Sequence, residues 1–230
     1  MATAAEAAAL ETGFRVVRLA VDLCRPTPLA PLELAWRHVR RGRRLALIEI
    51  RLRHGDAEVT RGSALLLAER GDVASGGRAE EPPPPGPHGI APTPFMPAEV
   101  RALAPPGFHR SVEIRLTEDE LGPAAWLTTP LALVAGEETS PIVRAAMLSD
   151  LTFSIGWRTQ LSRRGAAPGM RVPLINADMT LYLERAPAGD WVAFRSARLS
   201  DDRGVGLAEV TQLDAHGRYG RSLQALVANG

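Results

Sequence analysis

The feature that most constrains the fold is an internal repeat, because a segment near the start of the chain reappears in altered form near its end. The first copy begins at Arg18 and the second at Ala177. Four landmarks keep an offset of 160 to 162 residues, and they are the pairs Arg25 and Arg185, Gly42 and Gly204, Gly55 and Gly217, and Arg61 and Arg221. This constancy indicates duplication, so the chain is expected to build one unit twice.

Both copies show the alternation of half-buried strands. Val17, Leu19, Val21 and Leu23 alternate with polar or small residues, and residues 112–116 follow the same pattern. Further strands are predicted at residues 32–39, 44–53, 57–68, 125–134, 178–185, 191–199, 205–213 and 218–227. Glycine in the segments RRGRR, RHGDA, DDRGVG and DAHGRYG predicts turns between them, and therefore antiparallel hairpins.

One strong helix is predicted at residues 141–160. Ser140 and Pro141 form a favourable N-cap and first helical position, and apolar residues follow at helical spacing. A weaker helical segment covers residues 4–11. Each copy therefore predicts a helix followed by four hairpin-connected strands, an α+β unit in which a curved antiparallel sheet wraps its helix.

A change in composition divides the chain. Residues 71–107 contain EEPPPPGPHGIAPTPFMP and no apolar periodicity, which predicts a proline-rich linker running over the surface. The expected units are therefore residues 1–70 and 108–230, joined by 71–107.

Charge and composition exclude several classes of function. The 230 residues carry a net charge of +1, so nucleic acid is not an expected partner, and all 27 basic residues are arginine, which codon bias explains. No stretch approaches the roughly 20 apolar residues of a membrane span, and a cytoplasmic location is expected. With Cys24 alone and no histidine ligand spacing, neither a disulfide nor a metal site is expected.

The sequence resembles the double-hotdog acyl-CoA thioesterases of the thioesterase II type and the related thioesterase-like proteins of bacteria. The resemblance is carried by the order of RLAVDLCRPTPLAPLEL, SPIVRAAMLSD, INADMTLYLERAPAGDW and GVGLAEVTQLDAHGRYGRSLQ. It implies a double hotdog, with antiparallel sheets wrapping central helices, and hydrolysis of an acyl-CoA thioester to a free acid and coenzyme A. Coenzyme A would be part of the substrate, and no other cofactor is expected.

The resemblance also implies a catalytic set. In the family, a helical Asp, a Thr or Asn before the following strand and a Gln on the last strand hold the hydrolytic water. By position these residues match Asp150, Asn176 and Gln224.

The residues themselves leave alternatives open. Asp150 shares a helical face with the apolar Val143, Met147 and Leu151, where a carboxylate needs a partner or a role, unless it lies at a frayed helix end and turns to solvent. Gln224 is otherwise a solvent-facing strand residue. Asn176 is otherwise an ordinary turn residue.

The two copies differ in what precedes them. The second part has nearly 70 residues before Ala177, whereas the first has 17 before Arg18, so the first hotdog is expected to be N-terminally truncated. The exposed edge and shortened helix that follow favour a homodimer or higher oligomer.

Two other functions fit the pattern. Truncation favours a non-catalytic acyl-CoA-binding or scaffold protein, while a hotdog dehydratase is weaker because no Asp and His pair is suitably placed. A cluster at a predicted hairpin tip is either a solvated turn or a contact for coenzyme A phosphates or RNA, and it comprises Arg37, Arg40, Arg41, Arg43 and Arg44.

Overall fold

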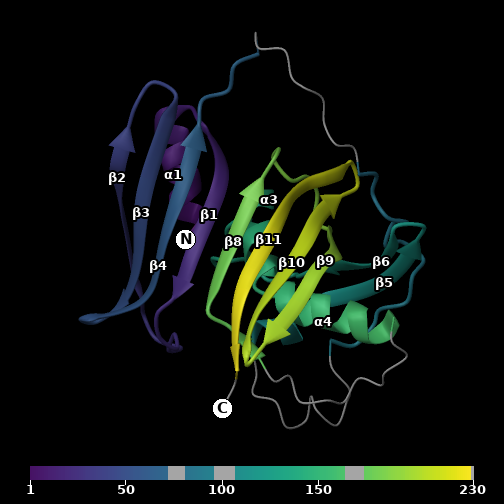
Figure 1. Ribbon diagram of the computed structural model, residues 1–230. Coiled ribbons are helices and arrows are strands. Elements are labelled where there is room, and N and C mark those ends of the chain that lie inside the picture. Colours follow the sequence, from purple (N-terminus) through teal and green to yellow (C-terminus); the bar gives the residue numbers. More distant parts are fainter. Residues whose placement is uncertain (72–80, 96–106, 164–173, 229–230) are drawn as a thin grey trace.

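The computed structural model describes residues 1–71, 81–95, 107–163 and 174–228, and it contains one antiparallel sheet that runs through the whole molecule. We refer to residues 1–71 as the first half and to the described residues from 81 onward as the second half. The order of the strands is β2-β3-β4-β1-β8-β11-β10-β9-β6-β5, with β7 paired to β11 (Figure 1).

The first half consists of α1 (Ala2–Thr12), β1 (Arg15–Leu23), β2 (Glu33–Arg41), β3 (Leu45–His54) and β4 (Ala57–Leu67). The second half begins with a short 3₁₀ turn, a hairpin and two helices, which are η1 (Phe108–Arg110), β5 (Glu113–Asp119), β6 (Gly122–Thr128), α3 (Pro141–Ser149) and α4 (Thr152–Arg163). It ends with β7 (Leu174–Asn176), β8 (Asp178–Leu183), β9 (Val192–Asp202), β10 (Val205–Asp214) and β11 (Gly217–Ala228).

The strand order repeats, as the internal duplication predicts. The first-half order β2-β3-β4-β1 matches the second-half order β9-β10-β11-β8, and a helix precedes each set. In the second half the β5–β6 hairpin flanks β9, where Ala124 pairs with Arg195. No strand of the described residues lies on the corresponding side of β2.

The two halves meet where β1 pairs with β8. The register runs from Arg18 opposite Tyr182 to Asp22 opposite Asp178. This pairing makes the two four-stranded repeats into one sheet, which Figure 1 shows passing from the purple to the green strands.

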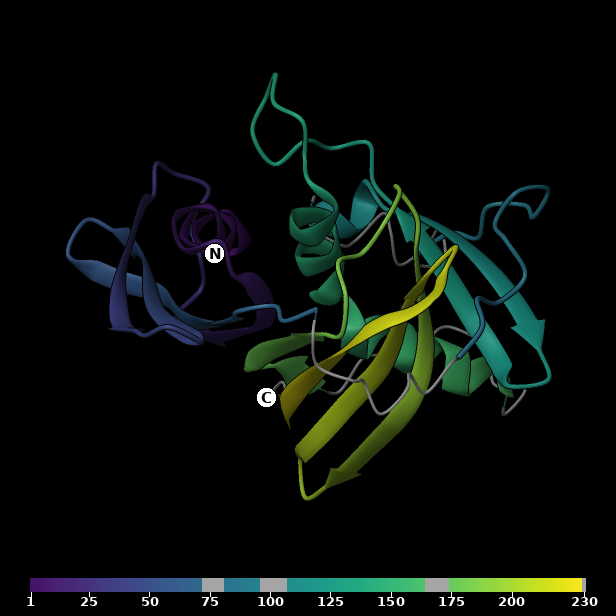
Figure 2. The ribbon, with the colours of Figure 1, turned by 90° about the horizontal axis from the view of Figure 1, so that it is seen from above.

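The helices lie inside the curves of the sheet and share one core. Figure 2 shows α1 end-on within the curve of the first-half strands, with α3 between it and the second-half strands. Alanines on α1, including the fully buried Ala5 and Ala8, let its backbone approach Ile48 and Ile50 of β3. Ser140 Oγ donates to Glu6 Oε1 at 2.5 Å, which ties α3 to α1. The halves therefore bury apolar surface against each other as well as sharing backbone hydrogen bonds.

The single helix predicted at 141–160 is interrupted. Ser140 caps it as expected by accepting from the Val143 N–H at 3.2 Å, but α3 ends at Ser149 and α4 begins at Thr152. The strand predicted at 125–134 is corrected, because it runs from Gly122 to Thr128. The predicted glycine turns are present, and Gly55, Gly204 and Gly217 have positive φ whereas Gly42 does not.

The proline-rich segment is packed where the structure describes it. Trp126 Nε1 donates to Pro85 O at 2.7 Å, Arg115 Nη1 donates to Pro87 O at 2.9 Å, and Glu81 pairs with Arg195 at 3.0 Å. Residues 81–95 therefore form a strap against the second-half sheet, held by side chains of that sheet.

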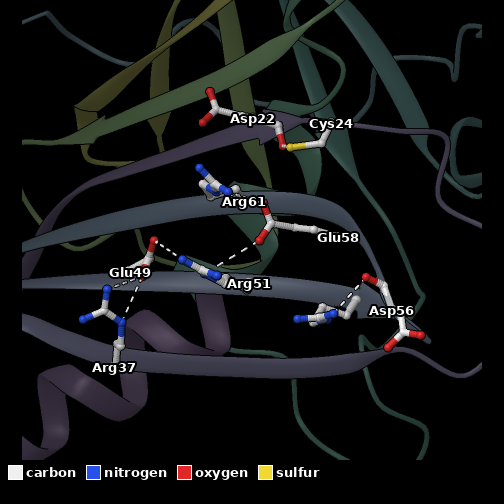
Figure 3. A network of polar contacts seen from close by, with 9 residues as sticks. Asp22, Cys24, Arg37, Glu49, Arg51, Asp56, Glu58 and Arg61 are labelled. Carbon is white, nitrogen blue, oxygen red and sulfur yellow. Dashed lines mark hydrogen bonds and ion pairs between the residues drawn. The ribbon is translucent and has the colours of Figure 1, made fainter.

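Charged side chains cover the outer face of the first-half sheet, as Figure 3 shows. Glu49 of β3 accepts from Arg37 at 3.0 Å and from Arg51 at 2.9 Å, and Glu58 of β4 accepts from Arg61 at 2.8 Å. These residues alternate along their strands with core residues, which is the pattern of a sheet with one solvated face.

A buried ion pair anchors the turn between β10 and β11. Asp214 is fully buried, and Arg185 donates to its two oxygens at 2.6 and 2.5 Å while the N–H groups of Ala188 and His216 donate at 2.9 and 2.8 Å. Desolvation alone would raise the pKa of Asp214, but these hydrogen bonds outweigh it and the pKa lies below its usual value.

Replacing Asp214 with Asn should lower the free energy of unfolding at pH 7 by about 3 to 5 kcal/mol, because it leaves the Arg185 charge buried and unpaired. A lowered folded-state pKa contributes stability above the unfolded value of about 4 and loses it as pH falls through the folded value. The difference between wild type and Asp214→Asn should therefore shrink on acidification, measured by urea unfolding at several pH values. Glu184→Gln, in a more exposed pair with Arg218, is the control and should cost at most about 1 kcal/mol. A pH-independent difference would contradict this account.

Candidate active site

The structure brings Asp150, Asn176 and Gln224 together from three elements. Asp150 follows the last residue of α3, Asn176 ends β7, and Gln224 lies in β11. Asn176 Nδ2 donates to Asp150 Oδ1 at 3.1 Å, and Gln224 Nε2 donates to the Asp150 backbone O at 3.0 Å. Residues that are up to 74 positions apart in sequence thus form one cluster.

Gln224 is fully buried and its amide spans the interruption between the two helices. Nε2 donates to the carbonyl oxygens of Ser149 and Asp150 at 3.2 and 3.0 Å, and Oε1 accepts from the Phe153 N–H at 2.9 Å. These are backbone groups that a helix end leaves without partners. The alternative of a solvent-facing Gln224 is therefore wrong.

The chain interrupts its own helix with short polar side chains. Ser149 Oγ donates back to Ala145 O at 2.7 Å, and Thr152 Oγ1 donates to Ser149 O at 2.8 Å. The Leu151 N–H bonds to Leu148 O, three residues back, before the four-residue spacing resumes with Ile155 N–H to Leu151 O. These bonds turn the backbone at Asp150.

Asp150 does not lie in a buried apolar stripe as the uninterrupted helix predicted. The turn changes the helical phase, so Leu151 is buried while the Asp150 side chain is accessible to solvent. Surrounding protein nevertheless desolvates the carboxylate and raises its pKa, against a smaller lowering effect of the hydrogen bond from Asn176. A water-accessible carboxylate with a raised pKa, held by an amide donor, has the properties of a general base.

The first half also reaches this cluster. The Leu23 N–H at the end of β1 donates to Ala177 O at 3.0 Å, directly after Asn176. The arginine groove formed by Arg40, Arg43 and Arg44 instead borders Leu67, which pairs with Arg15 at the other end of β1. Within one chain, the arginine groove therefore lies near the start of β1, whereas the cluster that contains Asp150 lies near the end of β1.

Sequence reasoning missed the polar residues that surround the cluster. Gln212 of β10 and Ser222 of β11 are fully buried, and Gln212 Nε2 donates to Ser149 Oγ at 2.7 Å. The available signal was the spacing along β10, since Gln212 lies two and four positions after the core residues Val210 and Ala208 and therefore on the same, inner face of the strand.

Among the residues that the structure describes, no group of three or more His, Cys, Asp or Glu side chains is arranged to hold a metal ion. Within the same residues no helix has the length and apolar character needed to cross a membrane.

Comparison with solved structures identifies the fold. A protein from Novosphingobium aromaticivorans, provisionally described as a thioesterase, matches at 22% identity with a TM-score of 0.70, covering 100% of this chain and 87% of that one. An acyl-CoA thioesterase II from Mycobacterium marinum matches at 14% identity with a TM-score of 0.67, covering 98% and 86%. A protein of unknown function from Alicyclobacillus acidocaldarius, described as having a hot dog fold, matches at 15% identity with a TM-score of 0.65, covering 94% and 79%. No curated protein matches in sequence.

The chain therefore has a hotdog fold. Family models add the particular class: that of the acyl-CoA thioesterase C-terminal domain matches residues 79–228, and that of the acyl-CoA thioesterase N-terminal domain matches residues 1–67. The chain belongs to the acyl-CoA thioesterase family, and it is a thioester hydrolase.

Replacing Asn176 with Ala should raise the pKa of Asp150 further, because the hydrogen bond that favours the ionised form is lost while the desolvation remains. The pKa can be followed through the Asp150 carboxyl carbon by NMR titration. Ile175→Ala, at the exposed neighbouring position, is the control and should leave it unchanged. An unchanged or lower pKa in Asn176→Ala would show that the amide does not act on the carboxylate.

Proposed function

We propose that this thioesterase hydrolyses an acyl-CoA thioester to a free acid and coenzyme A with a water molecule held by Asp150, Asn176 and Gln224. The observation that carries the proposal is the geometry at the helix interruption. A solvent-accessible carboxylate accepts a hydrogen bond from Asn176 while Gln224 fixes the backbone that bears it.

The chemistry divides among the three residues. The Asn176 amide occupies Oδ1 of Asp150, so Oδ2 is the oxygen that takes a proton from water. The water oxygen then attacks the thioester carbonyl carbon, the C–S bond breaks, and the leaving coenzyme A thiolate takes the proton from Asp150, which returns the carboxylate to its ionised form. Gln224 is fully buried, and its part is to fix the Asp150 carbonyl and the Phe153 N–H beside which the water is held.

We further propose that the hotdog is a double one, whose first unit has no counterpart of the β5–β6 hairpin among the described residues. The matched strand orders of the two halves support this arrangement, as does the β5–β6 hairpin that only the second half has among the described residues. The units are residues 1–70 and 108–230, with 71–107 between them. Acyl-CoA is the substrate, no separate cofactor takes part, and the protein acts in the cytoplasm.

Asp150→Asn should lower kcat for release of free thiol from acyl-CoA by at least about 100-fold, because the amide cannot accept the proton. The same change should leave the protein as stable or more stable at pH 7. A raised folded-state pKa means that the ionised carboxylate costs stability above that pKa, and the amide removes this cost. Thiol release is measured over short, medium, long and aromatic acyl-CoAs, and stability by urea unfolding.

Asp201→Asn, at an exposed carboxylate of β9, is the matched control and should retain wild-type turnover. Equal rates in wild type and Asp150→Asn would remove Asp150 from the mechanism. If the wild type releases no thiol but binds acyl-CoA in calorimetry, the alternative of a non-catalytic acyl-CoA-binding protein holds instead.

The free side of β2 supports a proposed homodimer. Leu34 and Val39 on this strand are 43% and 52% exposed, and no strand of the described residues covers the edge. Antiparallel pairing of β2 with β2 of a second copy would set Glu33 of each copy near Arg41 of the other, which are opposite charges.

Sedimentation should therefore give twice the 24.7 kDa monomer mass, and Val39→Lys should shift the equilibrium toward monomer by adding charge to a pairing edge. Val205→Lys, at a position 64% exposed in β10, should leave the mass unchanged. A monomeric wild type, or a dimer that Val39→Lys does not weaken, would contradict pairing through β2.

A further inference from the structure

A buried network of polar side chains lies between the second-half sheet and the helix interruption. Its members come from α3, α4, β10 and β11, and each is less than 1% exposed. They are Ser149, Thr152, Gln212, Tyr219 and Ser222. Buried polar groups reduce stability unless hydrogen-bonded, so the network is informative only if every member is paired.

The hydrogen bonds of the network run in one consistent direction. Tyr219 OH donates to Gln212 Oε1 at 2.7 Å, and Gln212 Nε2 donates to Ser149 Oγ at 2.7 Å and to Ser222 Oγ at 2.8 Å. Because Thr152 Oγ1 uses its proton on Ser149 O, the 2.5 Å contact between Thr152 and Ser222 takes its proton from Ser222. Each side-chain N–H and O–H proton thus has one acceptor.

The state of Tyr219 agrees with this direction. Desolvation, together with the charge of Asp214, places the pKa of Tyr219 well above its usual value despite the nearby Arg185. Tyr219 therefore remains a donor across the physiological range, and it fixes which way the Gln212 amide points.

The first half shows that the sheet does not require these polar groups. β11 Ser222 pairs with Leu181 and β10 Val210, as β4 Gly62 pairs with Val21 and β3 Ile50. This register places three polar second-half positions against three nonpolar first-half ones, namely Gln212 against Leu52, Ser222 against Gly62, and Gln224 against Ala64. The same strands fold without an amide or hydroxyl at these places in the half that has no helix interruption.

We propose that Gln212, Ser222 and Thr152 are positioning residues for hydrolysis, which hold the interruption between α3 and α4 so that Asp150 faces Asn176. The proposal rests on the proposed function of Asp150 and extends that function to residues that do not contact the substrate. Gln212 holds Ser149 on one side of Asp150, and Ser222 holds Thr152 on the other. Gln224 fixes the carbonyls between them.

The α4 helix offers a matched pair of variants. Thr152→Val removes the hydroxyl that joins Ser222 to Ser149 O. Thr159→Val makes the same change at an equally buried threonine whose hydroxyl bonds only within its own helix, to Ile155 O and Gly156 O. Both variants lose a buried hydroxyl, but only Thr152 acts on the interruption.

Thr152→Val should lower kcat for acyl-CoA at least tenfold with KM within twofold of wild type, because the base is misaligned while the rest of the surface is intact. Thr159→Val should keep both constants within twofold, and Thr152→Ser, which retains the hydroxyl, should restore kcat. In parallel, NMR titration should show the Asp150 pKa moving toward its ordinary value of about 3.9 in Thr152→Val but not in Thr159→Val, since a loosened interruption hydrates the carboxylate.

Equal effects of Thr152→Val and Thr159→Val on kcat and on the Asp150 pKa would overturn the proposal. If wild type shows no turnover, the hydrolytic function fails, while a pKa change confined to Thr152→Val still supports positioning of Asp150. If Thr152→Val does not fold, Ser222→Ala replaces it. That variant removes the same link from the strand side, with the same expected and contrary results.

Discussion

The pairing of β1 with β8 is the interaction on which the rest of the molecule depends. It joins the two repeats into one sheet and brings their helices together, so that Ser140 at the start of α3 bonds to Glu6 of α1. It also places the end of β1 beside the turn that carries Asn176, through the bond from Leu23 N–H to Ala177 O. The apolar face of a hotdog sheet must be covered by its helix and by the adjacent hotdog unit. Here the two halves share one apolar core, so each covers part of the other.

Within the second half, the helix interruption at Asp150 forms the candidate site. A continuous helix over this span would pair its own backbone groups, whereas the interruption leaves Ser149 O, Asp150 O and Phe153 N–H for Gln224 to pair. The buried Gln224 amide bonds to all three backbone groups, and removing it would take a hydrogen-bond partner from each of them, leaving Ser149 O with the bond from Thr152 Oγ1. Because the backbone turns here, the Asp150 carboxylate is exposed to solvent and accepts a hydrogen bond from Asn176.

The sequence was sufficient for the outline of the fold. Alternation in β1, the Ser140–Pro141 cap and the glycine turns at Gly55 and Gly204 correctly predicted elements, because each depends on local chemistry. The helix interruption was not predictable in the same way, since 141–160 has helical spacing throughout and the turn is stabilised by Gln224 from β11.

The candidate site divides along the same line. Order along the chain and a family resemblance singled out Asp150, Asn176 and Gln224, and the structure places them in contact. Burial of Gln224 and the role of Gln212 depend on which strand faces the interruption, and only the register between β10, β11 and the helices fixes that. Local patterns do not contain this information.

The duplication bears on why the proposed site lies in one half only. At the three sheet positions where the second half has Gln212, Ser222 and Gln224, the first half has Leu52, Gly62 and Ala64, and α1 packs there through alanines. The first half has no interrupted helix to hold and therefore needs no buried amide, and nonpolar residues cover its sheet at lower desolvation cost. The buried polar groups of the second half carry that cost, which the proposed positioning of the Asp150 carboxylate accounts for. The first half contributes the end of β1, where the Leu23 N–H bonds to Ala177 O next to Asn176, and part of the shared apolar core.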